Sequence, residues 1–104
     1  MNDDSQYVQI VVSQLKPSAR RDAFIDLHRQ TAEWMAKHRD CVSYEVFEGQ
    51  QGAIADRIVW KSKAGAMRGN QEYAATGIAR GMQEIVANYT NFFGVPVNVD
   101  PVCG

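Results

Sequence analysis

Asp56-Arg57-Ile58-Val59-Trp60-Lys61-Ser62 is the stretch that decides the fold of this 104-residue chain. Its β-branched and aromatic residues are typical of a strand, and Ser62 follows where the N-cap of a helix would stand. Because side chains alternate along a strand, Asp56, Ile58 and Trp60 must share one face. The stretch therefore predicts a strand that leads directly into a helix, with a carboxylate and an indole on the same side.

The start of the chain predicts a strand and a long helix. Residues 7–12 alternate with the period of two that is typical of strands, although neither face is plainly polar. From Ala19 to about His38, apolar side chains recur every three or four residues, which predicts a helix with Ser18 as a plausible N-cap. A strand with two partly apolar faces is usually covered on both sides, and a second copy of the chain is the most economical second cover.

A hairpin is predicted next. Residues 41–47 alternate as a second strand, and residues 48–53 hold two glycines, which favour a loop that returns the chain as the strand 54–61. After that strand, Ser62 predicts a short helical turn that Gly69 interrupts.

The remaining sequence, residues 72–99, predicts a second long helix and a last strand. An apolar stripe indicates a helix from about Glu72 to Tyr89, although Gly77 and Gly81 within it should each cost ~1 kcal/mol relative to alanine. Residues 92–99 are predicted as the last strand. Pro96 cannot donate to a ladder, so this strand should lie at an edge of the sheet.

The predicted order is β-α-β-β-α-β, which is that of a ferredoxin-like α+β fold with an antiparallel four-stranded sheet and helices on one face. A chain of this length is expected to form a single domain, residues 1–104, with loose termini at 1–6 and 100–104. The bare face of the sheet predicts a homodimer built face to face.

Composition argues against several classes of function. A net charge of -1 and a pI near 6.1 do not suit a nucleic-acid-binding protein, and no apolar run approaches the ~20 residues that would span a bilayer. His28 and His38 lie too far apart to form a convincing metal site with Cys41 and Cys103. The acidic, polar first residues and the two free thiols indicate a protein of the reducing cytoplasm.

Two motifs resemble the antibiotic biosynthesis monooxygenase family of dimeric α+β barrels. Asp40-Cys41-Val42-Ser43-Tyr44-Glu45-Val46 is similar to the family's turn into its second strand, and Val59-Trp60-Lys61-Ser62-Lys63-Ala64 is similar to its third-strand exit. The resemblance covers roughly Tyr7 to Val99. It implies a dimeric barrel and a place among cofactor-free oxygenases that convert phenolic polyketide-like substrates to quinones, haem-degrading relatives, or proteins of unknown role.

The same resemblance implies roles for particular residues. Trp60 falls on the strand-end tryptophan of the quinone-forming members, and Arg80, if no gap intervenes, falls where those enzymes have an arginine facing the substrate. Asp56 stands where an asparagine would be expected, and Ala66 where a tyrosine would be. The histidine or asparagine of the short helix appears as Gly69, with Asn70 one step later.

Four residues are therefore candidates for catalysis, and each has a plainer alternative. Trp60 would wall an aromatic-binding cavity and aim its indole N–H at a substrate oxygen, or it would simply fill the core. Asp56 is a candidate base, or a carboxylate at the wet end of a strand. Arg80 would reach inward to an anionic oxygen, or extend into solvent. Asn70 would contact the ligand, or cap a helix.

Further residues are expected to bind the substrate. His28 lies in the apolar stripe of the first helix, where it is either an interior histidine or a second candidate for proton transfer. The complete predicted substrate-binding set is Phe24, His28, Ile58, Tyr73, Ile78 and Met82.

The leading hypothesis is a cofactor-independent monooxygenase that uses dioxygen to oxidise a phenolic or enolic aromatic to a quinone. No flavin, nicotinamide or phosphate-binding fingerprint is found, so no cofactor is expected. The alternative is a non-catalytic ligand-binding or dimerisation module on the same fold. Haem degradation is disfavoured because no histidine occurs between Trp60 and Gly104.

Overall fold

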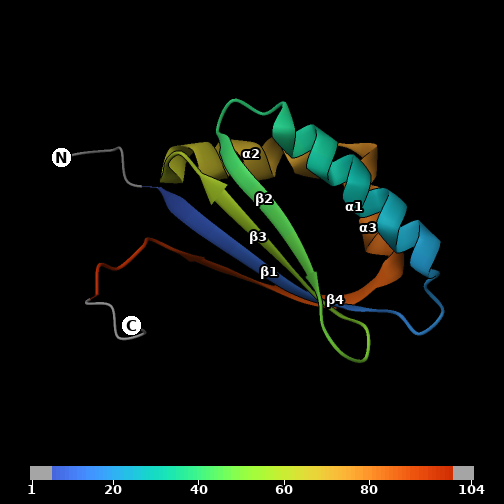
Figure 1. Cartoon of the computed structure of the whole chain (residues 1–104). Helices are drawn as coiled ribbons and strands as arrows, with labels where there is room; N and C mark the ends of the chain where they lie inside the picture. Colours follow the sequence, from blue (N-terminus) through green and yellow to red (C-terminus); the bar gives the residue numbers. More distant parts are fainter. Residues whose placement is uncertain (1–5, 100–104) are drawn as a thin grey trace.

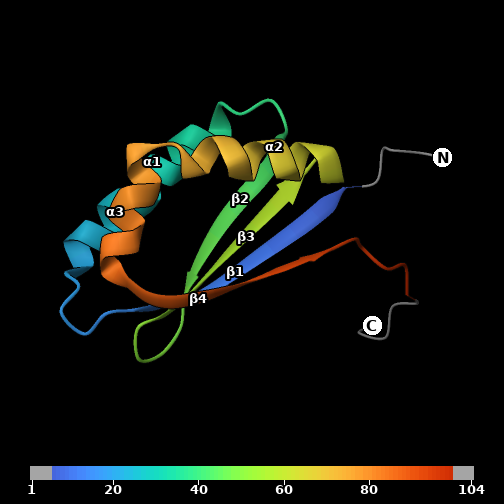
Figure 2. The ribbon, with the colours of Figure 1, turned by 180° about the vertical axis from the view of Figure 1, so that it is seen from behind.

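The structure is a computed structural model that describes residues 6–99, and its elements confirm the predicted ferredoxin-like fold (Figure 1). The elements are β1 (Tyr7–Leu15), α1 (Arg21–Ala36), β2 (Cys41–Glu48), β3 (Ala53–Trp60), α2 (Lys63–Ala74), α3 (Gly77–Ile85) and β4 (Val86–Gly94). Seen from behind, α2 and α3 follow one another across the same side of the sheet that α1 covers (Figure 2). The expected loose segment 100–104 and residues 1–5 lie outside the described part of the chain.

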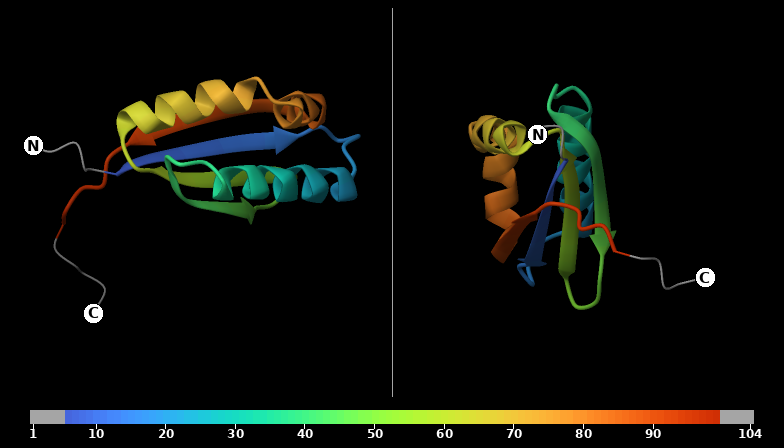
Figure 3. Two further views of the ribbon diagram at one scale, coloured as in Figure 1. Left: turned by 90° about the horizontal axis from the view of Figure 1, so that it is seen from above. Right: turned by 90° about the vertical axis from the view of Figure 1, so that its left-hand side faces the viewer.

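The four strands form one antiparallel sheet in the order β2-β3-β1-β4. Viewed from the helix side, β1 runs between α1 and α2 (Figure 3, left). Val11 of β1 is paired with Asp56 of β3 on one side and with Asn91 of β4 on the other. These three residues form a row across the middle of the sheet, and residues paired in this way point to the same face.

Strand β3, which ends at Trp60, contributes two residues to the buried core cluster. Trp60 is 0% exposed and forms a buried cluster with Met35, Ile58 and Ala66. The predicted N-cap at Ser62 is confirmed, because its side chain accepts a hydrogen bond from the N–H of Gly65 at 3.0 Å. The strand therefore passes directly into α2, which packs back over the indole.

The prediction of one long helix from Glu72 to Tyr89 is wrong. Helix α2 continues through Gly69 and ends at Ala74, and α3 starts anew at Gly77. Thr76 separates the two helices as the N-cap of α3, with its hydroxyl accepting from the N–H of Ala79 at 3.2 Å. A hydroxyl that bonds the backbone in this way competes with helix continuation.

Two further boundaries differ from prediction. The last strand is Val86–Gly94 rather than 92–99; it does lie at an edge of the sheet, but Pro96 follows it. Ser18 does not cap α1, because the N-cap is Arg20 and it makes no side-chain cap hydrogen bond.

The turn from α1 into β2 is held by a polar cluster outside the core. The Asp40 carboxylate accepts hydrogen bonds from Nε and Nη2 of Arg68 at 3.1 and 3.0 Å. This guanidinium holds the pKa of Asp40 below its usual value. The pair fastens the loop that follows α1 to helix α2.

Candidate functional site

A cavity of ≈ 570 Å³ lies between the helix-facing side of the sheet and the helices. Its lining comes from β1, β2, β3, β4 and all three helices. This volume falls within the range of about 300–1,000 Å³ that small-molecule sites occupy. Apolar walls are supplied by Met35, Ile58, Trp60 and Met82.

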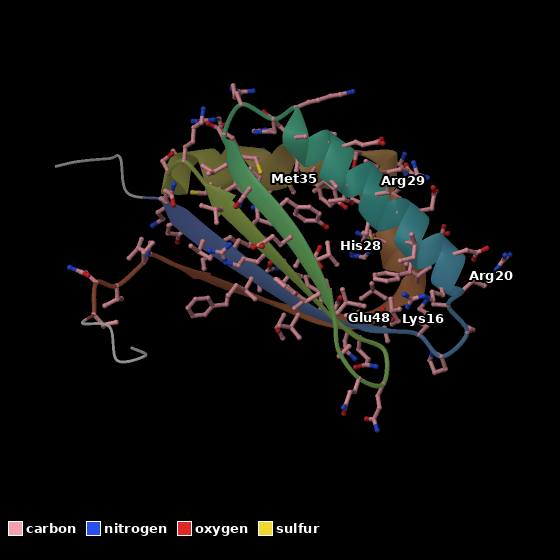
Figure 4. The ribbon with its side chains drawn as sticks, in the orientation of Figure 1. Lys16, Arg20, His28, Arg29, Met35 and Glu48 are labelled. Carbon is pink, nitrogen blue, oxygen red and sulfur yellow. The ribbon has the colours of Figure 1, made fainter. Side chains whose placement is uncertain are left out.

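One end of the cavity carries a histidine, a carboxylate and a phenol. His28 lies on the side of α1 that faces the sheet, whereas Arg20 and Arg29 extend away from it (Figure 4). Its Nε2 is 3.6 Å from Oδ1 of Asp56, and the hydroxyl of Tyr44 donates to Oδ2 of Asp56 at 2.8 Å. We refer to these three residues, His28, Asp56 and Tyr44, as the acid–base end.

The hydrogen bonds of His28 indicate which ring nitrogen carries a proton. Nδ1 lies 3.0 Å from the carbonyl oxygen of Phe24, which can only accept, so Nδ1 must be the donor. In the neutral ring Nε2 then holds the lone pair, and this is the atom that lies beside Asp56. A proton taken up at Nε2 would therefore be stabilised by the carboxylate.

The two tyrosines that line this part of the cavity stay protonated at neutral pH. Burial raises the pKa of Tyr44, and the neighbouring Asp56 raises it further. Burial also raises the pKa of Tyr73, whose hydroxyl lies 2.8 Å from Oγ1 of Thr31. Because the Thr31 hydroxyl donates to the carbonyl of Leu27 at 3.0 Å, the Tyr73 hydroxyl is the donor in their contact.

Side-chain amides make up a second polar group of the cavity wall, centred on Gln9. Its Oε1 accepts from Nε1 of Trp60 and from Nδ2 of Asn70, both at 2.9 Å. Its Nε2 donates to Oδ1 of Asn70 and to Oδ1 of Asn91, again both at 2.9 Å. Gln9 thereby uses two donors and two acceptor positions, which is its full capacity. We refer to Gln9, Asn70 and Asn91 as the amide end.

This network corrects two expectations. The N–H of Trp60 donates to Gln9 and is not aimed at a substrate oxygen, so the fully buried Trp60 ring supports the apolar side of the cavity from behind. Asn70 is not a helix cap, because it lies inside α2 and its Nδ2 bonds both Gln9 and the carbonyl of Ala66.

Most of the predicted site residues line the cavity. The lining includes Asp56, Trp60, Asn70, His28, Ile58, Tyr73 and Met82. The exceptions are Phe24, which packs edge-on against the His28 ring at 4.4 Å, and both Ile78 and Arg80 of α3. The break at Thr76 changes the face that α3 presents, so that Ala79 lines the cavity and Arg80 is exposed.

Sequence reasoning did not single out Gln9, Tyr44 or Asn91. The sequence does contain a signal for two of them. Gln9 is a polar residue within an otherwise apolar strand, and Tyr44 shares its strand face with apolar residues, so both are candidates for buried polar groups. Asn91 could not be found, because the predicted helix boundary placed it just before the strand to which it belongs.

Within residues 6–99, no group of three His, Cys, Asp or Glu side chains is placed to hold a metal ion. Over the same residues, no helix is both long and apolar enough to cross a membrane.

Known structures show the same fold over nearly the whole chain. A putative antibiotic biosynthesis monooxygenase from Chloroflexus aurantiacus is 21% identical, with a TM-score of 0.67 over 93% of this chain and 98% of the other. SnoaB, a cofactor-independent oxygenase from Streptomyces nogalater, is 11% identical, with a TM-score of 0.69 over 96% and 99%. A protein from Pseudomonas aeruginosa is 12% identical, with a TM-score of 0.74 over 94% and 100%.

No protein-family model and no curated protein sequence matches the chain. The structural matches nevertheless confirm, for the fold, the resemblance that the two sequence motifs carry. The chain has the ferredoxin-like α+β fold of the antibiotic biosynthesis monooxygenase structures.

Proposed function

We propose that the protein is a cofactor-independent monooxygenase that oxidises a phenolic or enolic aromatic to a quinone. The observation that carries this proposal is an apolar cavity of ≈ 570 Å³ with His28 and Asp56 side by side in its wall. The likeness in fold to a cofactor-independent oxygenase supports it.

His28 is the base in this proposal. Its Nε2 takes the proton of the substrate hydroxyl, and Asp56 stabilises the imidazolium that forms. Tyr44 donates to the other oxygen of Asp56 and so holds the carboxylate beside the ring. We therefore assign the role of base to His28 rather than to Asp56, and Asp56 is the group that positions and stabilises the ring in this proposal.

The resulting phenolate is electron-rich and reacts with dioxygen at the ring carbon opposite its oxygen. The peroxide formed there loses the remaining hydrogen of that carbon as its O–O bond breaks, and the proton held by His28 leaves with the hydroxide as water. One oxygen atom enters the product as a carbonyl, and the two substrate hydrogens leave in the water molecule. The apolar side chains of Ile58 and Met82 line the cavity beside the intermediate and lower the polarity of its surroundings.

Oxygen consumption with 1-naphthol or anthrone, in metal-free buffer, tests the proposal. We expect one equivalent of dioxygen per quinone formed, and a loss of roughly 10²-fold or more in kcat for His28→Asn, as is usual for a general base. Asp56→Asn and Trp60→Phe should also lower turnover. Arg29→Gln, one residue from His28 but exposed on the outer side of α1, is the matched control and should keep full activity.

The proposal fails if neither phenol supports oxygen uptake, or if His28→Asn turns over as fast as the unaltered protein. Binding of the phenol without oxygen uptake would favour a second candidate function, a non-catalytic ligand-binding module. The observation on its side is that the N–H groups of Trp60 and Asn70 are already bonded within the protein.

A further inference from the structure

We infer, on the basis of the function proposed above, that the cavity selects neutral phenols and excludes aromatics that carry a carboxylate. The inference concerns the charge of the substrate, and it follows from which ionisable groups line the cavity and which do not.

No lysine or arginine of residues 6–99 lines the cavity. Its lining includes one carboxylate, Asp56, and one imidazole, His28, while the remaining side chains are apolar, hydroxyl or amide groups. An anion bound against this lining would lose part of its hydration without meeting a positive partner, which costs more than the burial of a neutral polar group.

Protonation of His28 does not provide a positive partner for a bound anion. With a neutral ring, the acid–base end carries the single negative charge of Asp56. With a protonated ring, the positive charge lies 3.6 Å from that carboxylate and is paired with it. In both states the described residues that line the cavity have no unpaired positive charge to offer an anion.

The amide end is neutral as well. The carboxamides of Gln9, Asn70 and Asn91 are bonded to one another, and they present dipoles without net charge. Such a surface suits a carbonyl or a hydroxyl oxygen better than a carboxylate.

Two arginines, Arg80 of α3 and Arg57 of β3, do not line the cavity. Arg80, which the resemblance would have placed against the substrate, is exposed on α3. Arg57 alternates with the cavity-facing residues Asp56 and Ile58, so it lies on the opposite face of β3, where it donates to Glu45 at 2.7 Å. The missing cation therefore distinguishes this cavity from one built for an acidic polyketide.

Two ligands of nearly the same shape test the inference. Methyl 6-hydroxy-2-naphthoate is neutral, and 6-hydroxy-2-naphthoate is an anion at pH 7. Calorimetric titration under nitrogen measures binding of each without turnover. We expect the ester to bind at least about tenfold more tightly than the acid, since a like charge and an uncompensated desolvation both oppose the acid.

Two variants separate this charge effect from a general preference for the less polar ligand. Asp56→Asn removes the carboxylate, and Asn91→Lys adds a cation at the amide end on an exposed residue of β4. Each should improve binding of the acid relative to the ester by about threefold or more. Glu45→Gln, on the opposite face of the sheet, should leave the ratio unchanged.

Equal binding of ester and acid by the unaltered protein would overturn the inference. A preference for the ester that neither variant alters would also overturn it, because solvation of the ligands alone would then explain the preference. These outcomes are independent of the proposed function: binding selectivity without oxygen uptake refutes only the monooxygenase, whereas uptake with equal affinities refutes only the charge selection.

Discussion

At the scale of single residues, the position of Trp60 depends on two neighbours of very different size. Gln9, which is 2% exposed, holds the indole N–H from β1. Gly69 lets α2 lie directly on the opposite part of the ring, because a Cβ at this position would fall well inside van der Waals contact with Cη2 and Cζ3 of Trp60. A buried amide and an absent side chain thus act together to place one wall of the cavity.

We therefore expect Gly69→Ala to destabilise the protein by about 1–3 kcal/mol, the usual cost of overpacking a close-packed core. The added methyl group must push either α2 or the Trp60 ring, and both form part of the cavity. Urea unfolding measures the stability, and near-ultraviolet circular dichroism reports whether the indole has moved.

Gly77→Ala is the matched control. Its added Cβ would meet only the end of the Arg80 side chain at 3.7 Å, and alanine is the better helix former. It should be neutral or mildly stabilising. A Gly69→Ala protein as stable as Gly77→Ala would contradict the packing argument.

Residue-scale prediction succeeded where alternation along one strand was sufficient. Asp56, Ile58 and Trp60 were placed on one face by the period of two, and all three line the cavity. It was wrong for the indole N–H, because the partner of that group is Gln9, 51 positions away in the sequence and two strands earlier. Periodicity shows which face a side chain occupies, but not which distant side chain bonds it.

At the scale of elements, the break between α2 and α3 determines which residues of the second helical segment reach the cavity. The break depends on Thr76, whose hydroxyl accepts from Ala79 and donates to the carbonyl of Tyr73 at 2.7 Å. The short connection lets α3 change direction before the chain enters β4, as the view from behind shows (Figure 2).

Thr76→Ala should cost about 1 kcal/mol of folding stability, since it removes an N-cap hydrogen bond. The change in the midpoint of thermal or urea unfolding measures this loss. Ser18→Ala provides the comparison. The sequence pattern favours Ser18 as a cap, but the structure gives it no such role, so its removal should have little effect. Equal losses for both variants would mean that capping is not the cause.

Sequence reasoning joined the two helices because Ala75, Ile78 and Met82 keep a helical spacing across the break. The spacing of apolar residues does not detect a two-residue interruption that preserves it. Thr76 was the local signal, because threonine is one of the residues favoured at the N-cap of a new helix. The misplaced boundary at Tyr89 follows from this error. For Arg80, the structure agrees with the alternative in which the side chain extends into solvent.

At the scale of the whole molecule, the face of the sheet away from the helices exposes apolar side chains. Val12, Phe47 and Phe92 are 48%, 52% and 63% exposed. In the alternation along the strands, their side chains lie on the face opposite to the cavity-lining residues Val11, Asp56 and Asn91. Contiguous exposed apolar groups of this kind commonly mark an interface between proteins. This observation supports the face-to-face homodimer predicted from the sequence.

Phe92→Asp is expected to convert a dimer into a monomer, because the interface would have to bury a carboxylate near the partner's apolar face. Analytical ultracentrifugation at micromolar concentration should give about twice 11.6 kDa for the unaltered protein and the single-chain mass for the variant. Phe92→Leu preserves the apolar surface and should remain dimeric. A monomeric unaltered protein would refute the dimer outright.

The order β2-β3-β1-β4 also has a consequence for synthesis on the ribosome. Val8 of the first strand pairs with Val59 and Gly94, which are 51 and 86 residues further along the chain. At about 5–20 residues per second, the first of these partners is made roughly 3–10 s after Val8. During that interval the valine- and isoleucine-rich segment has no strand to join, and such exposed apolar surface and unpaired backbone are what chaperones protect.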